Sequence, residues 1–260
     1  MSAKQTIQIA VEKVEQLRQL AADTPSLAQA VSEIKAFQAQ RFTGTYFDLL
    51  HIPQYQPATQ FFLEELYSEK DYSQRDAQFS RIAGTLERMF PKMVVQTAVS
   101  LAQLHSMTED LDLAMAQSWL SSQNSARQTD QESNQVDRYI TAWHQVGRRA
   151  DRDAQLSGAL AVGQELVTLT RTPGLRMALK MMRKPASLAG LAALQHFLES
   201  GFDTFAAMDP KKPSKPGQPE GPAYFLETVK KREGALINQL FGASVQASKA
   251  EIERVLSKAA

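Results

Sequence analysis

Charged and phenolic side chains gather in residues 41–90, a stretch that also holds six of the twelve phenylalanines and four of the six tyrosines. Carboxylates, guanidinium groups and tyrosine hydroxyls that converge can bind a small polar ligand, and carboxylates can also perform acid–base catalysis. Buried between helices, the same groups would instead form an ion-pair network that fixes how the helices pack. The candidate ligand-binding residues are Arg41, Tyr46, Asp48, Glu64, Tyr67, Arg75 and Asp76.

Two expectations concern the geometry of these candidates. Arg41, Tyr46 and Asp48 come from one predicted helix, from which they can meet Arg75 and Asp76 across a groove. Arg75 and Asp76 are adjacent and point in different directions on a helix, so we expect that they do not pair with each other. We interpret the set as a structural network, with a ligand pocket as the alternative, because structural ion-pair networks are common.

A short basic helix is predicted at residues 175–183, between a Thr-Pro-Gly break and a Lys-Pro break. A basic amphipathic helix can lie on anionic lipid, hold phosphate groups or dock an acidic partner protein. The alternative is an ordinary solvated face whose aliphatic stems cover the core. The candidate basic-surface residues are Arg171, Arg176, Lys180, Arg183 and Lys184.

His105 falls on the apolar face of its predicted helix and is a candidate axial ligand for haem, which needs an apolar pocket and one histidine. The alternative is a core histidine that hydrogen-bonds to a backbone carbonyl. No histidine follows a glutamate by three residues, which argues against a carboxylate-bridged di-metal centre. We therefore predict no metal site and no cofactor, with haem at His105 as the one exception.

The chain has no cysteine, which excludes disulfides, thiolate nucleophiles and cysteine-ligated zinc or iron–sulfur clusters. It lacks the glycine-rich phosphate-binding motifs, the His-Glu-x-x-His zinc motif and the Gly-x-Ser-x-Gly nucleophile elbow. The net charge of +1 gives no basis for specific nucleic-acid binding. The familiar catalytic motifs are therefore absent from the sequence.

Helical periodicity dominates the chain, beginning with Ile7, Ala10, Val11 and Val14 on one face of a first helix. No segment alternates as a strand would. The sequence predicts an all-α fold, a single multi-helix bundle of about eight to ten helices.

Local signals predict where particular helices begin and end. Ser106 and Glu109 resemble a capping box that would start a shorter helix reaching Trp119. One long helix is expected over residues 129–171, and an apolar helix over residues 186–208.

Residues 209–222 hold five prolines and two glycines in fourteen positions, a composition typical of an extended linker. We therefore expect a main helical bundle at 1–208, a Pro/Lys-rich linker at 209–222 and a C-terminal helical arm at 223–260. The arm is amphipathic, so we expect it to pack on the bundle.

Charges interrupt the first twenty residues, so we expect no signal peptide. No run approaches the roughly 18 apolar residues that a membrane-spanning helix needs. The expectation is a soluble cytoplasmic protein without a transmembrane segment.

Three motifs carry a resemblance to a known family. These are RF-x-x-TY-x-DLL from Arg41, FFLEELYS-x-x-DYSQRDAQFSRI from Phe61, and PA-x-x-AGL-x-x-LQ-x-FLE-x-GF over 185–202. Together with Tyr55 they resemble a bacterial family of uncharacterised, all-helical proteins for which no activity is established. The resemblance covers most of residues 35–210 and implies a bacterial origin and one continuous domain. It assigns no catalytic residue.

These observations favour a noncatalytic binding or regulatory module that acts through a helix groove or the basic helix, on a protein partner or an anionic surface. The first alternative is a small-ligand or haem-type binding protein with a pocket in the bundle. The second is an enzyme that uses carboxylates, arginines and tyrosines of residues 41–81, since such groups need no motif for acid–base work.

Overall fold

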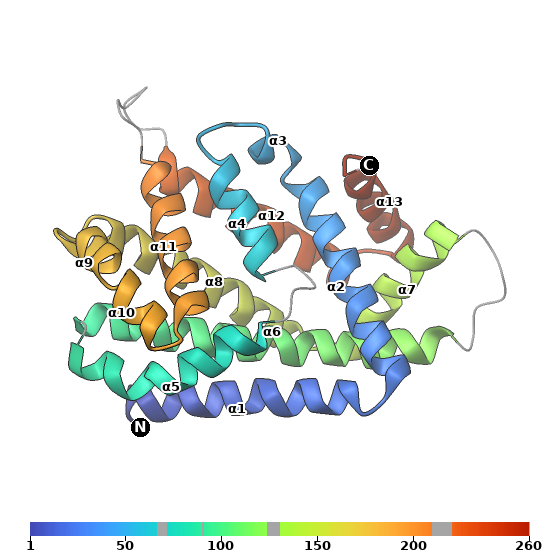
Figure 1. The fold of residues 1–260 in the computed structure, drawn as a ribbon. Coiled ribbons are helices and arrows are strands. Elements are labelled where there is room, and N and C mark those ends of the chain that lie inside the picture. Colours follow the sequence, from blue (N-terminus) through green and yellow to red (C-terminus); the bar gives the residue numbers. More distant parts are fainter. Residues whose placement is uncertain (67–71, 90, 124–130, 210–219, 260) are drawn as a thin grey trace.

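The computed structural model describes residues 1–66, 72–89, 91–123, 131–209 and 220–259. Over these ranges the chain forms thirteen α-helices and no β-strand, so the all-α prediction is confirmed for the described part, and the expected count of eight to ten was too low (Figure 1). The helices are α1 (Ala3–Ala22), α2 (Pro25–Thr45), α3 (Phe47–Leu50), α4 (Gln56–Leu66), α5 (Ser73–Met89), α6 (Lys92–Gln123), α7 (Gln131–Val146), α8 (Arg149–Thr170), α9 (Leu175–Met181), α10 (Arg183–Leu188), α11 (Ala192–Ala207), α12 (Gly221–Gly242) and α13 (Val245–Leu256).

Some of the additional helices arise because glycines in the left-handed backbone region divide helices that were expected to be continuous. Gly147 has φ of 59° and separates α7 from α8, where one helix was expected over 129–171. Gly190 has φ of 67° and separates α10 from α11, which divides the helix expected over 186–208. A glycine at positive φ ends a helix. Hydrophobic periodicity depends on side-chain polarity, so it does not reveal a helix break caused by the backbone conformation of one residue.

The prediction that a shorter helix starts at Ser106 is also wrong, because here one continuous helix replaces two expected ones. Ser106 is buried in the middle of α6, which runs unbroken for 32 residues. Leu104 and Leu111 on either side are buried as well, so both halves of the helix stay in contact with neighbours. Tertiary packing of an apolar face contributes more helical stability than a local capping signal.

α6 is the central element of the bundle, because it packs against α1, α2, α7 and α8. α1 and α6 run side by side along one edge of the molecule, with α5 next to them (Figure 1). α2, α4, α11 and α12 stand on the other side of this pair in the same view. None of the described helices is long and apolar enough to cross a membrane.

The C-terminal helices pack onto the rest of the chain. α12 contacts α7 and α8, and α13 contacts α2 and α7. α12 supplies Leu236 and Leu240 to one hydrophobic cluster and Phe225 and Val229 to another. The division into bundle, linker and arm stays a prediction; positions 210–219 of that linker lie outside the described residues, and α12 begins at Gly221.

At Gly44 the backbones of α2 and α13 lie close together. A Cβ atom at this position would lie 1.9 Å from the carbonyl oxygen of Val255. We expect Gly44→Ala to lower the free energy of unfolding by about 1–3 kcal/mol, because α13 must shift to accommodate the methyl group. Urea unfolding monitored by circular dichroism measures the change.

Gly234→Ala is the matched control, since its new Cβ atom would come no closer than 3.9 Å to Leu156. In mid-helix this substitution should leave stability unchanged or raise it by about 1 kcal/mol. Equal losses in the two variants would contradict the tight contact at Gly44.

Candidate functional site

A cavity of about 110 Å³ lies between α1, α5, α6, α8, α9 and α11, and we call it the main cavity. α6 supplies Ala98, Leu101, Ala102 and His105, which share a face because three or four residues separate them. The two alanines leave room that larger side chains would fill. The other apolar residues on the wall are Ala10, Val11, Phe79, Val94, Leu104, Leu166, Leu169, Leu175, Leu179, Leu194, Phe197, Leu198 and Phe202.

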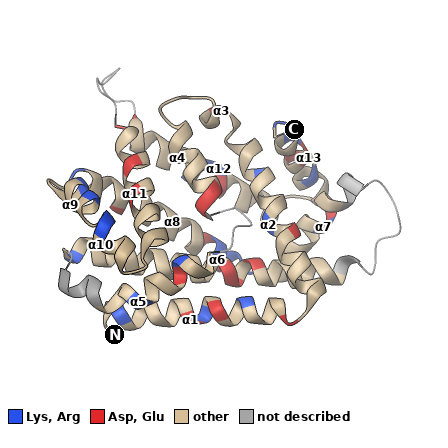
Figure 2. Cartoon of the chain, in the orientation of Figure 1, with Lys and Arg blue, Asp and Glu red and all other residues tan. Residues whose placement is uncertain are grey.

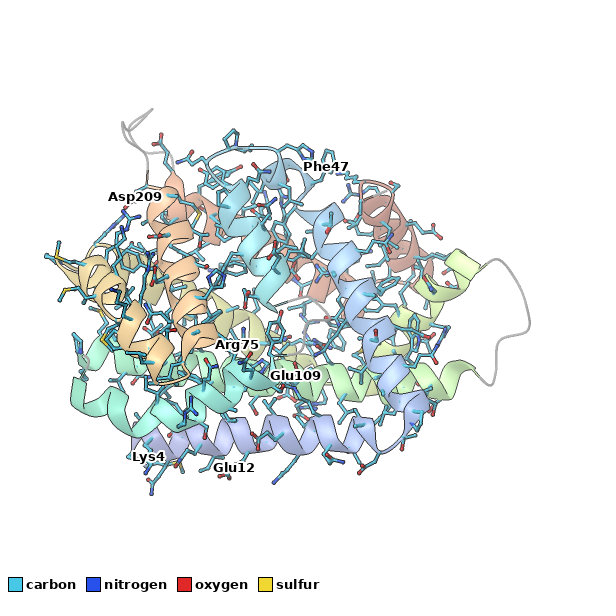
Figure 3. All side chains as sticks on the ribbon, in the orientation of Figure 1. Lys4, Glu12, Phe47, Arg75, Glu109 and Asp209 are labelled. Atoms are coloured by element: carbon cyan, nitrogen blue, oxygen red, sulfur yellow. The ribbon has the colours of Figure 1, made fainter. Side chains whose placement is uncertain are left out.

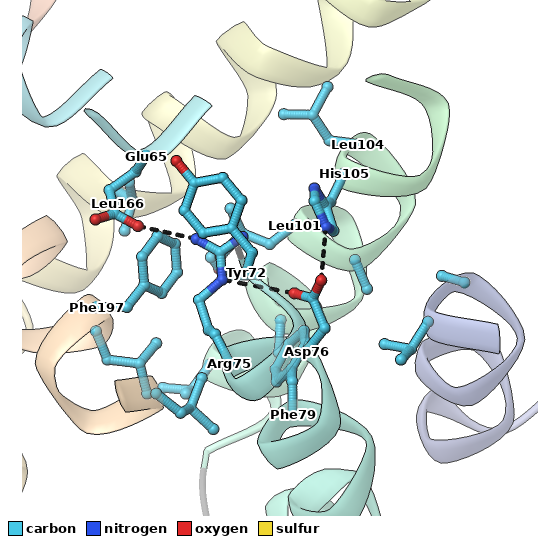
Figure 4. A pocket seen from close by; sticks show the side chains of 18 of the residues that line it. Glu65, Tyr72, Arg75, Asp76, Phe79, Leu101, Leu104, His105, Leu166 and Phe197 are labelled. Carbon is cyan, nitrogen blue, oxygen red and sulfur yellow. Dashed lines mark hydrogen bonds and ion pairs between the residues drawn. The ribbon is translucent and has the colours of Figure 1, made fainter. Parts of the chain in front are cut away.

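Polar residues close one end of the main cavity, and we call them the polar end (Figure 4). They come mainly from α5 and α6, with contributions from α2 and α4. Its members are Lys35, Glu65, Tyr72, Arg75, Asp76, His105, Thr108 and Glu109.

Asp76 is the hub of the polar end. Its Oδ2 atom accepts hydrogen bonds from Arg18 Nη2 at 2.7 Å and from His105 Nε2 at 3.0 Å. Burial acts to raise the pKa of Asp76, but the hydrogen bond from His105 and the charges of His105, Arg75 and Arg18 outweigh it. The net result is a lowered pKa, so the group is a carboxylate at neutral pH.

The prediction that Arg75 and Asp76 do not pair is wrong. Arg75 Nε lies 3.6 Å from Asp76 Oδ1, because the long arginine side chain folds back over its neighbour. Arg75 Nη1 also donates to Glu65 Oε2 at 2.9 Å. The guanidinium carbon lies 4.1 Å from the ring centre of Tyr72 and 4.8 Å from that of Phe197. Arg75 therefore joins α4, α5 and α11 along one wall of the cavity.

A polar seam continues inward between α2 and α6. Lys35 Nζ donates to both carboxylate oxygens of Glu109, at 2.8 and 2.9 Å. One helical turn further, Gln38 Nε2 donates to Asp112 Oδ1 at 3.0 Å. Asp112 is buried, and burial raises its pKa despite the attraction of Lys35 and Arg152. Figure 3 shows Arg75 and Glu109 near the middle of the molecule.

The structure places Arg41 and Tyr46 at the inner end of this seam, away from the main cavity. Arg41 Nη1 donates to both carboxylate oxygens of Glu233, at 2.8 and 3.1 Å, and the Tyr46 hydroxyl donates to the same carboxylate at 3.0 Å. Arg41 and Tyr46 are almost fully buried. In the described part of the chain, Arg41 and Tyr46 are not among the residues that line the main cavity with Arg75 and Asp76.

The other candidates from residues 41–90 do not join the main cavity either. Asp48 is exposed and receives two hydrogen bonds from Arg232, at 2.6 and 2.7 Å. These bonds lower the pKa of Asp48 against the effect of burial. The side chain of Glu64 is exposed, while its backbone carbonyl accepts the Tyr72 hydroxyl. Tyr67 lies outside the described residues.

Two smaller cavities adjoin the main one. A second cavity of about 70 Å³ surrounds Arg41 and Glu233 and shares Leu104 and Thr108 with the main cavity. A third, of about 40 Å³, shares Leu104 with both of the others. The three cavities therefore meet at Leu104.

The sequence prediction missed Glu233 and Arg152, the other charged residues of the second cavity. Glu233 interrupts the apolar stripe of α12 between Val229 and Leu236. A charge inside such a stripe predicts a buried partner, and Arg41 interrupts the stripe of α2 in the same way after Phe37. Matching the two irregular positions would have suggested this pair.

The basic-surface candidates on and beside α9 and α10 are largely neutralised by acidic residues of α11 and its C-terminal end (Figure 2). Arg171 and Arg176 pair with Asp209 and Asp203, each at 3.0 Å. Arg183 Nε donates to Glu199 at 2.8 Å, and this hydrogen bond lowers the pKa of the Glu199 carboxyl to about 2. The remaining two candidates, Lys180 and Lys184, are exposed.

Around these two lysines, three apolar side chains are exposed to an unusual degree. The exposed fractions are 69% for Met177, 72% for Met181 and 90% for Leu188. Contiguous exposed apolar side chains often mark an interaction surface.

His105 directs its Nε2 atom to Asp76, so an axial bond to haem through this nitrogen would require loss of that hydrogen bond. Haem binding at His105 stays a prediction. Among the described residues, no group of three His, Asp or Glu side chains is placed to hold a metal ion.

A family model described as a domain of unknown function (DUF8198) matches residues 17–247. The chain belongs to this family. The DUF8198 match covers the seam, all of α12 and the residues that line the main cavity except Ala10 and Val11. No curated protein and no solved structure matches the chain.

Asp76→Asn tests the hub of the polar end. We expect it to lower the free energy of unfolding at pH 7 by about 2–4 kcal/mol, because Arg18 and Arg75 lose a buried counter-charge. The wild-type carboxylate contributes fully above its ordinary pKa of 3.8, and the contribution is lost as the pH falls through the lowered pKa. The difference in the free energy of unfolding between the wild type and Asp76→Asn, measured by urea unfolding, should therefore shrink below pH 3.8.

Asp153→Asn is the control, because Asp153 is exposed and its ion pair with Arg149 Nε is long, at 3.7 Å. Its effect should stay within about 0.5 kcal/mol. If Asp76→Asn remained destabilised by the same free energy at low pH, this result would contradict the lowered pKa of Asp76.

Proposed function

We propose that the protein is a noncatalytic binding protein whose ligand is a small, mainly apolar molecule held in the main cavity. The observation that carries this proposal is the cavity itself, an apolar space of about 110 Å³ closed at one end by charged groups. Protein interiors rarely keep voids larger than a water molecule. A void that persists where Ala98 and Ala102 stand in place of larger residues favours an occupant.

The energetics support an occupant of this kind. At roughly 24 cal/mol per Å³, an empty cavity of about 110 Å³ destabilises the fold by on the order of 2–3 kcal/mol. An apolar cavity of about 150 Å³ in another protein stays dry and binds benzene or xenon. The main cavity is somewhat smaller, so a short alkyl chain or a small ring matches it best.

The polar end supports a binding role over a catalytic one. Asp76 is held by Arg18, Arg75 and His105, and Glu109 is held by Lys35, so these groups are already engaged with one another. A general acid or base works best with a pKa near the working pH. The lowered pKa values of Asp76 and Asp48 move away from that range. An enzyme in residues 41–81 stays the less favoured prediction.

Filling the cavity tests the proposal. We expect 1-pentanol to bind the wild-type protein in ligand-observed NMR and to raise its melting temperature, because a ligand of the native state stabilises it. Ala102→Leu places extra atoms in the main cavity and should abolish both effects. Ala98→Val is a milder alternative if the leucine disturbs folding.

Ala161→Leu, on the exposed side of α8, is the control and should bind 1-pentanol as the wild type does. Absence of binding to the wild-type protein up to the solubility limit of the alcohol would refute the proposal. So would unchanged binding in the folded Ala102→Leu and Ala98→Val variants.

A second candidate function concerns the face formed by Met177, Lys180, Met181, Lys184 and Leu188, which combines exposed apolar side chains with two exposed lysines. This composition suits an acidic protein partner or an anionic lipid surface. The cytoplasmic location and the bacterial origin also stay predictions.

Lys180 and Lys184 are the residues to substitute in a test of this face, because the three arginines near it are paired with acidic residues. If it meets anionic lipid, the protein should sediment with vesicles containing phosphatidylserine, and binding should weaken with salt. The double variant Lys180→Gln/Lys184→Gln should lose this binding. Lys230→Gln/Lys231→Gln, which removes two exposed lysines of α12, should keep it. Equal behaviour of the two double variants would reject the lipid interpretation.

A further inference from the structure

The two ring nitrogens of His105 have different surroundings. Nε2 lies 3.0 Å from Asp76 Oδ2 and 3.4 Å from Arg18 Nη2, whereas none of the described residues forms a hydrogen bond with Nδ1. Nδ1 points away from Asp76 (Figure 4). The His105 side chain lines the main cavity and is 19% exposed, so the edge of the ring that Asp76 leaves uncovered is open to a ligand.

The contacts of Nε2 decide which nitrogen of His105 carries the proton. An ionised carboxylate only accepts hydrogen bonds, so Nε2 donates to Asp76. Arg18 can only donate, and its Nη2 atom lies closer to Asp76 Oδ2, at 2.7 Å, than to Nε2. In a neutral imidazole, a protonated Nε2 leaves Nδ1 as an acceptor. A ligand at this edge of the ring therefore has to supply a hydrogen-bond donor.

The charged groups around His105 leave no excess charge for a ligand to neutralise. Three cations and three carboxylates at or beside the polar end form ion pairs with one another, namely Arg18 with Asp76, Lys35 with Glu109 and Arg75 with Glu65. A buried charge without a partner is unfavourable, so a charged ligand group added to these balanced pairs would be destabilising. A neutral donor avoids this penalty.

Thr108 adds a second hydrogen-bonding group to the wall. It lies three residues after His105 on α6, so the two side chains share a face of the helix. Thr108 Oγ1 accepts a hydrogen bond from Gln155 Nε2 at 2.9 Å, and no acceptor for the Thr108 hydroxyl proton lies among the described residues. A ligand hydroxyl suits an acceptor at His105 and a donor at Thr108, because a hydroxyl both donates and accepts.

We propose that the main cavity selects an apolar ligand with a hydroxyl group, an aliphatic alcohol or a phenol, whose O–H donates to Nδ1 of His105. The proposal rests on the function proposed above for the main cavity and names the class of its ligand. Asp76 is a positioning residue, because its hydrogen bond with Nε2 holds the imidazole with Nδ1 free to accept.

A pair of isomers, 1-pentanol and butyl methyl ether, tests this inference, because only the alcohol has an O–H donor. We expect 1-pentanol to bind the full-length wild-type protein at pH 8 about 2- to 10-fold more tightly than the ether in ligand-observed NMR, the range for one neutral hydrogen bond. His105→Phe removes the acceptor and keeps a ring of similar size, so it should abolish this preference. Ala102→Leu should weaken both ligands.

His144→Phe is the matched control, because His144 is exposed on α7 and does not line the main cavity. It should keep the wild-type preference for the alcohol. The nitrogen NMR signal of His105 Nδ1 in the wild-type protein is a second readout. It should shift more when 1-pentanol is added than when the ether is added, because only the alcohol donates to this atom. If His105→Phe does not fold, which circular dichroism reports, this signal decides.

The outcomes separate the two proposals. Equal affinity for the two ligands, tighter binding of the ether, or an unchanged preference in folded His105→Phe would overturn the hydroxyl assignment and leave the function of the main cavity standing. An Nδ1 signal that responds equally to both ligands would do the same. Failure of both ligands to bind the wild-type protein would overturn both proposals.

Discussion

The ion pair between Arg41 and Glu233 is the constraint on which the arrangement of this protein depends. It joins α2 to α12 across 192 positions of sequence, and the Tyr46 hydroxyl completes the carboxylate's hydrogen bonds. A buried pair of this kind contributes little net stability, since desolvation offsets much of the attraction. Its value lies in specificity, because any other placement of α12 would leave a buried charge without its partner. α12 also belongs to two hydrophobic clusters, so fixing α12 fixes how those clusters meet.

The polar seam extends this constraint through the interior. Lys35 pairs with Glu109, Gln38 with Asp112, and Glu33 accepts a hydrogen bond from Trp119, so polar contacts tie α2 to α6 at several points. Apolar packing between two helices tolerates some sliding, whereas paired polar groups do not. α6 borders both features, since Ala98 and Ala102 line the main cavity and Glu109, further along the same helix, belongs to the seam.

The sequence predicted the helical class, because apolar periodicity is a property of many residues at once. The sequence-based prediction of helix ends failed where a single residue sets the end, as at Gly147, whose left-handed backbone ends α7. At the site, Arg75 and Asp76 were chosen for their residue types, and both line the main cavity. Arg41 was chosen on the same grounds, yet its partner Glu233 comes from a distant helix. Local patterns mark Arg41 and Glu233 as charges inside apolar stripes, but which charges pair depends on how the helices are placed.

α6 contacts five other helices along its 32 residues, which bears on how a molecule in the main cavity would be exchanged with solvent. Displacing so long a rod would disturb α1, α2, α7 and α8 together. The opposite wall is built from shorter pieces, α9 and α11; α9 contacts α8, α10 and α11, while α11 also packs on α4 and α5. Moving α9 away from α11 would break the exposed ion pair of Arg176 with Asp203 and would open the buried contact of Leu175 and Leu179 with Phe202. Because α9 has fewer neighbours than α6, we expect the interior to exchange with solvent on the side of α9 and its exposed methionines.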